Sequence, residues 1–320
     1  MPSHFWLNLE QNYREFLARQ KEAEAIEIEI ASYRQWLKSF PFKEMMRLGW
    51  IEPQQGEIDT IRALLSFFRI ASKDQWSWER AVGLRTAFRQ AAISQSPARF
   101  ALAAWLWKGH LDAQRIETAS YDIDTFNAAL GEMRGLTIAP FNEAISKMRE
   151  ECSRSGVALA FTHELLGIRV YGATRWLANG RPLVQMCLRG KSDDQVWFTF
   201  FHESAHILLH GRTDIFVESE DSTDIEKDNQ KEEEANRWAS SILIPDDAWE
   251  DFASDVFWRI QGNDIRHFKR YGTERIQFIR RFASEQGIAL GIVVGRLQKQ
   301  GLVPWNQCND LKVALRWKTS

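Results

Sequence analysis

Hydrophobic positions in the first half of the chain recur with the period of an α-helix. The stretch from Leu7 to Leu37 is amphipathic and rich in Glu, Ala, Arg and Gln, all good helix formers. Glycine and proline residues separate the helical stretches that follow, predicted at about 57–70, 77–94, 97–108, 110–118, 122–132 and 140–154. Because strand-like alternation is nearly absent, residues 1–150 are predicted to form an all-α region.

The pattern changes after Gly156. β-Branched and aromatic residues occupy 157–161 and 168–172, and an Asn-Gly pair at 179–180, a strong hairpin signal, precedes the apolar run 183–188. These features predict a small antiparallel sheet of about three strands.

Helical periodicity returns with a long apolar helix that Asp193 and Asp194 begin. Further helices are predicted at about 230–243, 246–258, 263–270, 273–286 and 290–300. The predicted fold class is therefore α+β, mostly α. Its predicted parts are the all-α region, a mixed domain over 151–260 that contains the sheet, and C-terminal helices over 261–320 that pack on that domain.

Composition narrows the class of protein. The chain has 320 residues, 44% hydrophobic and 26% charged, with a formal net charge of -2. These values are typical of a globular protein, and a dedicated nucleic-acid-binding chain would carry a basic excess. Three widely spaced cysteines form no disulfide framework, so we expect a reducing cytoplasm. The longest apolar stretches fall short of the ~20 residues that a membrane span needs.

One motif carries specific chemistry. Residues 202–206 read His-Glu-Ser-Ala-His, the HExxH pattern. His202 and His206 are four residues apart, so on a helix their imidazoles lie on one face and can bind one cation. Zinc accepts neutral imidazole nitrogen and, in catalytic sites, keeps one position for water. Glu203 is the predicted catalytic base that takes a proton from that water.

The surroundings of the motif support a metal site. Most neighbouring residues are apolar, so the helix is expected to be buried on most sides. The polar exceptions form one narrow stripe at Thr199, His202, Glu203, His206 and His210. Burial of this stripe without partners would cost several kcal/mol, which a metal and a water-lined cleft would avoid. The alternative is two core histidines hydrogen-bonded to the backbone.

A catalytic zinc needs a third protein ligand. Helical phase favours Glu232, because Glu232 and Asn236 lie on one face with two alanines that allow close approach to the HExxH helix. Glu233 is the alternative ligand. Asn236 could hydrogen-bond a ligand imidazole. His210, one turn beyond His206, is expected to support the site at the helix end, with metal ligation as its less favoured role.

These motifs resemble the ImmA/IrrE metallopeptidase domain over roughly residues 150–260. The resemblance rests on the His202–His206 helix, the Glu232–Asn236 segment that matches E-x-x-A-N, and the Ile242–Pro245 ending. Two further runs, at 172–176 and 198–211, are similar to larger HigA-like regulators that join a Cro/repressor-type helix-turn-helix to such a domain. In those proteins the segment after the helix-turn-helix reads much like Phe5–Tyr13, so we expect a DNA-binding part upstream of Met1.

The resemblance implies a zincin-like, specifically gluzincin-like, hydrolase with His202, His206 and Glu232 as zinc ligands and Glu203 as catalytic base. It also implies a regulatory role in transcription, stress response or a toxin–antitoxin pair, with a repressor, antitoxin or toxin as protein partner. The alternative is a regulatory scaffold whose peptidase site is latent or vestigial and whose aromatic-rich helices form a partner surface or a homodimer interface. An acidic segment at 214–234 is then either a solvated loop or a mobile flap.

Stabilisation of the oxyanion would require a donor besides zinc. Sequence offers four candidates in the C-terminal helices without choosing among them: Tyr271, His267, Arg275 and Arg296.

Overall fold

The computed structural model describes residues 3–77, 97–189, 192–210, 216–219, 229–260 and 272–317. Within them the chain divides into two compact units. The first unit holds 3–77, 97–107 and 165–167, and the second holds 108–164 and the described residues from 168 onward. The domain limits expected at 150 and 260 stay a prediction.

The first unit is helical. Its elements are α1 (Ser3–Ile28), α2 (Ile30–Lys38), α3 (Phe42–Arg47), α4 (Glu57–Phe68), the 3-10 turn η1 (Lys73–Gln75) and the first part of α6 (Pro97–Ala113). The helix expected from Leu7 to Leu37 is therefore two helices. They are separated at Glu29, whose carbonyl accepts the N–H groups of Ser32 and Tyr33 and so begins the second helix.

Two clusters of side chains hold this unit together. Ile26 and Tyr33 pack with Ile61 and Leu65 of α4. Phe40, Trp76 and Phe100 form a second, aromatic group, with ring centroids 4.9 to 5.5 Å apart. Such close aromatic pairs add to the stability gained from burial alone. The helix expected at 77–94 lies outside the described residues.

Helix α6 corrects one prediction. The sequence predicted a break at Gly109, but α6 continues to Ala113. A Cβ atom at position 109 would lie 2.0 Å from the side-chain amide of Gln185, so the glycine lets this helix lie against the sheet. Close packing outweighs the weak helix propensity of glycine here.

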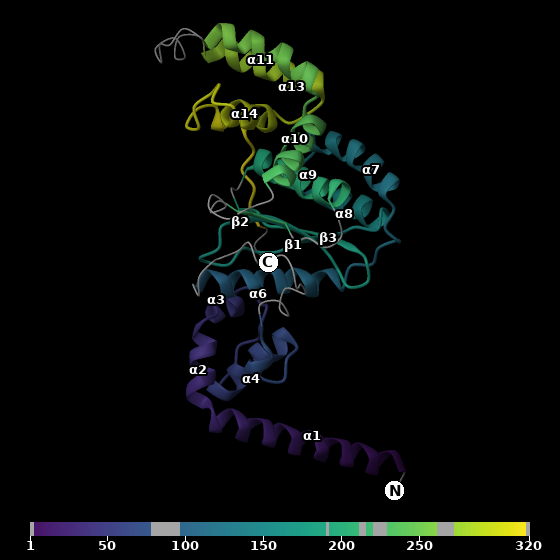
Figure 1. The fold of residues 1–320 in the computed structure, drawn as a ribbon, viewed down its shortest axis with the longest axis vertical. Helices are drawn as coiled ribbons and strands as arrows, with labels where there is room; N and C mark the ends of the chain where they lie inside the picture. The colour runs from purple at the N-terminus through teal and green to yellow at the C-terminus, as the bar shows by residue number, and fades with distance from the viewer. Residues whose placement is uncertain are drawn as a thin grey trace. The chain divides into compact units, whose positions relative to one another are not determined.

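The second unit contains the sheet and the remaining helices (Figure 1). Its described elements are α7 (Ile123–Gly135), η2 (Leu136–Ile138), α8 (Phe141–Arg154), β1 (Ala158–Phe161), β2 (Val170–Trp176), β3 (Pro182–Met186), α9 (Asp193–Leu209), β4 (Phe216–Ser219), α10 (Asn229–Leu243), α11 (Asp246–Ile260), α13 (Gly272–Gln286), α14 (Leu290–Lys299) and η3 (Asn309–Leu311). The α+β, mostly helical fold class is confirmed. The helix expected at 263–270 lies outside the described residues.

The sheet is mixed, so the prediction of an antiparallel sheet was wrong in part. The strand order is β1-β3-β2-β4. The β2–β3 hairpin forms as expected, and β4 adds antiparallel to β2. However, β1 pairs parallel to β3, because the eight residues between β1 and β2 carry the chain past the position of β3. Strand β4 falls in the acidic segment for which no strand was predicted.

The sheet is buried on both faces. On one face Leu159, Val184 and Met186 join the main core, to which α7, α8 and α9 contribute. On the other face Leu183 packs with Ala113 at the end of α6. Strands buried on both faces need continuous rather than alternating apolar residues, and all five residues of β3 are buried. None of the described helices has both the length and the apolar character of a membrane-spanning segment.

The first turn of α9 is joined to α14 and to the C-terminal segment. The N–H of Val313 donates to Asp193 Oδ1 at 2.9 Å, and Lys312 Nζ pairs with Asp194 Oδ2 at 2.6 Å. Glycines at 291 and 295 face these carboxylates, and a Cβ at either position would lie within 2.6 Å of them. Burial raises the pKa of Asp193 to about 6.

Candidate metal centre

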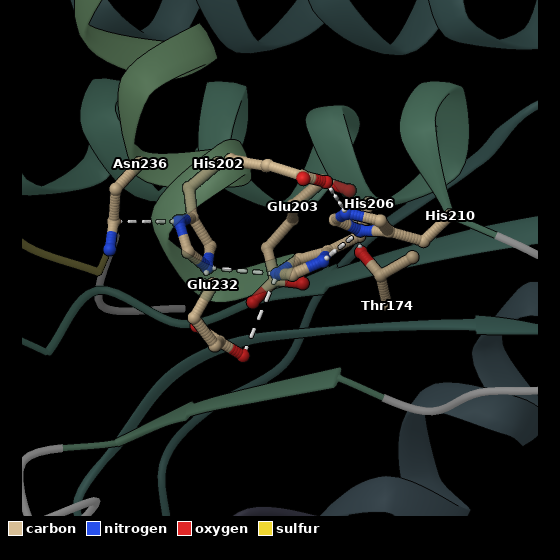
Figure 2. Close-up of polar contacts among 8 residues, drawn as sticks. Thr174, His202, Glu203, His206, His210, Glu232 and Asn236 are labelled. Atoms are coloured by element: carbon tan, nitrogen blue, oxygen red, sulfur yellow. Dashed lines mark hydrogen bonds and ion pairs between the residues drawn. The ribbon is translucent and has the colours of Figure 1, made fainter. Parts of the chain in front are cut away.

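Three potential metal ligands converge where α9 and α10 pack together (Figure 2). His202 and His206 lie one turn apart on α9, and their Nε2 atoms are 3.0 Å apart. Glu232, in the first turn of α10, places Oε2 3.4 Å from His202 Nε2 and Oε1 3.8 Å from His206 Nε2. One ligand atom from each residue lies within 4.8 Å of the others. Two imidazoles and one carboxylate match the donor set of a catalytic zinc site.

The environment of His202 orients its ring. Its Nδ1 lies 3.0 Å from Asn236 Oδ1, one turn along α10 from Glu232. An amide oxygen only accepts, so Nδ1 carries the hydrogen and the lone pair is on Nε2. A ring fixed in this tautomer presents the nitrogen that a metal requires.

A longer hydrogen-bonded chain supports His206. Its Nδ1 lies 2.9 Å from His210 Nδ1, and His210 Nε2 lies 3.3 Å from Glu234 Oε2. Because a carboxylate only accepts, His210 donates from Nε2 and accepts at Nδ1, which leaves the hydrogen of His206 on its Nδ1. Hydrogen bonds from Gln230 and His210 hold the pKa of Glu234 below its usual range.

The two tautomers explain why the centre suits a cation. Both Nε2 lone pairs point toward the same place, and they would repel each other at 3.0 Å without a shared positive charge. His202 and His206 are buried, with 2% and 1% of their surface exposed. A divalent ion between them and Glu232 would satisfy all three groups. Three members of the predicted polar stripe, His202, His206 and His210, thus have side-chain hydrogen-bond partners.

The other predicted residues lie as follows. Glu233 is exposed and is outside the ligand group, as helical phase predicts for the neighbour of Glu232. His210 is also outside the group, and it contacts His206. Glu203 is fully buried beside the histidine pair, and its backbone carbonyl accepts a hydrogen bond from Thr174 Oγ1 at 2.9 Å. The contact with Thr174 had no signal in the sequence motif.

A cavity of about 550 Å³ opens onto the centre. His202, Glu232 and Asn236 line it together with residues of α14 and Trp305. Its wall also includes three buried apolar side chains: Leu243 at the end of α10, Ile244 directly after it, and Ile292 of α14. A space of this size next to polar groups is typical of a site that binds a small molecule or a peptide side chain.

Of the four candidate oxyanion donors, Arg296 is the one described residue that lines this cavity. Its guanidinium donates to the carbonyls of Ser240 and Ile244 and pairs with Asp246 at 3.1 Å. These contacts give Arg296 a structural role at the end of α10. Arg275 does not line the cavity, and positions 267 and 271 lie outside the described residues.

The helix, its paired histidines and the facing carboxylate define a site of the metallopeptidase type. Consistent with this class, residues 188–278 match the family model of the IrrE N-terminal-like domain, Peptidase_M78. The match covers α9, β4, α10 and α11 and confirms the ImmA/IrrE resemblance in this part of the chain. A search of curated proteins finds no match for the chain.

Proposed function

We propose that this protein is a zinc-dependent metallopeptidase that hydrolyses a peptide bond in a regulatory protein partner. The convergence of His202, His206 and Glu232 beside the buried Glu203 carries the proposal. The match to a peptidase family model over the same helices supports it.

The mechanism follows from the residues around the centre. A zinc ion held by the three ligands would act as a Lewis acid, polarising the scissile carbonyl and activating a water molecule. The Glu203 carboxylate would take a proton from that water and return it to the leaving amine. Asn236 and His210 hold the two imidazoles in the required tautomers. The adjacent cavity would bind substrate residues next to the scissile bond and exclude bulk water.

The proposed substrate is a repressor, antitoxin or toxin in the cytoplasm. This part of the proposal rests on the resemblance to regulators that carry such a peptidase domain. A peptidase that controls a regulator would act on one partner rather than on proteins in general.

The test combines metal analysis with a Glu203→Gln variant. The purified protein should contain about one zinc per chain, and the variant should keep it. Cleavage of a repressor, antitoxin or toxin that the parent protein cleaves should fall by about 10²- to 10⁴-fold, the usual contribution of a general base. Full cleavage by metal-free protein, or by the variant, would exclude the proposal.

A second candidate is a regulatory scaffold with a latent peptidase site that acts by binding its partner. Exposed apolar side chains on α1 favour it: Phe5, Trp6, Leu7, Leu9, Tyr13 and Phe16 are each 46% exposed or more. Clustered exposed apolar groups are typical of interaction surfaces, including homodimer interfaces. Partner co-purification that is unchanged by Glu203→Gln, with no cleavage by either protein, would favour the scaffold over the peptidase.

A further inference from the structure

Strand β2 packs against Glu203, the proposed catalytic base. Gly172 and Thr174 are two residues apart on this strand, so they face the same side. Thr174 Oγ1 donates to the Glu203 backbone carbonyl at 2.9 Å. A Cβ atom built at Gly172 would lie 2.9 Å from both Cγ and Oε1 of Glu203, and 2.7 Å from Cγ2 of Thr199. The strand therefore touches both the backbone and the side chain of this residue.

These contacts leave Glu203 little freedom. Its side chain is fully buried, and separations below 3.0 Å are shorter than a Cβ atom tolerates. A methyl group at position 172 could be accommodated only if the Glu203 side chain moved or α9 rose from the sheet. Movement of α9 is opposed by the Thr174 hydrogen bond and by the packing of Phe200 and Phe201 in the main core.

We infer that β2 positions the Glu203 carboxylate: Gly172 provides the space for its side chain, and Thr174 fixes its backbone. The inference rests on the proposed function for the role of Glu203, and on geometry alone for the positioning. It also gives a structural role to two residues, Gly172 and Thr174, of the run at 172–176, which lies outside the matched segment 188–278.

The principal test is Gly172→Ala. Metal affinity should stay within about threefold of the parent value, because the atoms nearest to a Cβ at Gly172 belong to Thr199 and Glu203 and not to the three ligands. Cleavage of the partner should fall about 100-fold, the loss expected when a reacting group is displaced by about 1 Å. The visible absorption spectrum of the cobalt(II)-loaded protein should change as well, since it reports the surroundings of the ion without any turnover.

Gly109→Ala is the matched control. It creates an even closer clash, 2.0 Å from the Gln185 side chain, in the same unit but against a residue outside the metal centre. It should lower the melting temperature as much as Gly172→Ala does, or more, while its cobalt spectrum stays that of the parent. If the cobalt spectrum and the cleavage rate change equally in both variants, the effect of Gly172→Ala is general destabilisation. That result would overturn the inference.

A second variant separates the two residues that the added methyl group approaches. Thr199→Ser removes the Cγ2 atom, 2.7 Å from the Cβ position, and leaves both Glu203 contacts. In the Gly172→Ala background it should therefore leave cleavage low. Recovery of the parent rate would show that the contact with Thr199, and not displacement of Glu203, slows cleavage, and would overturn the inference. If the parent protein cleaves nothing, the proposed function fails, while the cobalt spectra of Gly172→Ala and Gly109→Ala still decide the positioning.

Discussion

Helices α9 and α1 depart from the usual distribution of polar and apolar residues in opposite directions. Along α9 six polar side chains are buried: Asp193, Thr199, His202, Glu203, Ser204 and His206. Along α1 seven large apolar side chains are exposed: Phe5, Trp6, Leu7, Leu9, Tyr13, Phe16 and Ile28. Buried polar groups and exposed apolar groups are the informative exceptions in a folded protein, because each is unfavourable unless it has a partner.

The comparison shows which partner each helix needs. Among the polar groups of α9, His202 and His206 point toward each other and toward Glu232 of α10, so a single ion can bind all three from within the unit. Most side chains of α1 are exposed, and Ile26 is the one described residue of α1 that is buried. A second macromolecule would cover the exposed apolar side chains of α1, whereas a metal ion would bind the buried histidines of α9. The two anomalies can therefore be tested separately.

Removal of one imidazole should have the largest effect. His206→Ala should weaken zinc binding roughly 10³-fold, if three ligands share about equally the ~10–16 kcal/mol typical of a protein zinc site. Competition with a coloured chelator measures this change. The control is His110→Ala, which removes a histidine of α6 that bonds Gln114. It should leave the zinc affinity unchanged. Equal zinc affinity of His206→Ala and the parent protein would show that α9 does not bind the ion.

Substitution of Asp193 should have an intermediate effect and tests the cost of burying charge in α9. Its pKa is raised from 3.8 to about 6, mainly by desolvation on burial; the backbone N–H of Val313 opposes this shift and the neighbouring Asp194 adds to it. The folded state thus binds this proton more tightly than the unfolded chain does. The contribution of Asp193 to the free energy of unfolding must therefore fall as pH rises from about 4 to 6, and stay low above 6.

Asp193→Asn keeps the acceptor for the Val313 N–H but removes the charge. It should raise the free energy of unfolding by roughly 1–2 kcal/mol at pH 7.5, after a helix-dipole loss of up to ~1 kcal/mol. Urea unfolding should show this gain shrinking as pH falls toward 4. Asp247→Asn, at an exposed carboxyl in the first turn of α11, is the control. A loss of stability of equal size at pH 4.5 and 7.5 would show that the buried charge is not the cause.

Substitutions on α1 should have the smallest effect on stability. Phe5, Leu9 and Phe16 lie on one side of the helix, and their replacement by serine should change the free energy of unfolding by no more than about 0.5 kcal/mol each. Ile26→Ala on the same helix, which removes a buried side chain, should cost roughly 2–5 kcal/mol. If the triple serine variant loses as much free energy of unfolding as Ile26→Ala does, α1 packs within its own unit and its apolar side chains need no partner.

The parts of the site that sequence could predict are those set by local geometry. His202 and His206 are four residues apart on one helix, so their spacing alone places them on one face. Glu203 was predicted from its place in the HExxH motif. Helical phase also favoured Glu232 over Glu233, and the structure groups Glu232 with the histidines. The contact between His206 and His210 follows from the same periodicity, since the two are four residues apart.

Long-range packing limited the remaining predictions. The parallel pairing of β1 with β3 depends on where the chain crosses the sheet, which alternation of residue types does not encode. Within α6, position 109 has room only for glycine, because the side chain of Gln185, 76 residues later in the chain, packs against it. Likewise, nothing in the sequence near Gly172 shows that this strand lies against α9.

The attachment of α9 to the C-terminal segment has a consequence for synthesis on the ribosome. Lys312 follows its partner Asp194 by 118 residues, and Val313 follows Asp193 by 120. At translation rates of about 5–20 residues per second, the first turn of α9 is made roughly 6–24 s before these partners. A nascent chain that already carries both histidines thus has two adjacent carboxylates without their final contacts. The helix that presents the metal ligands gains its last tertiary contacts late in translation.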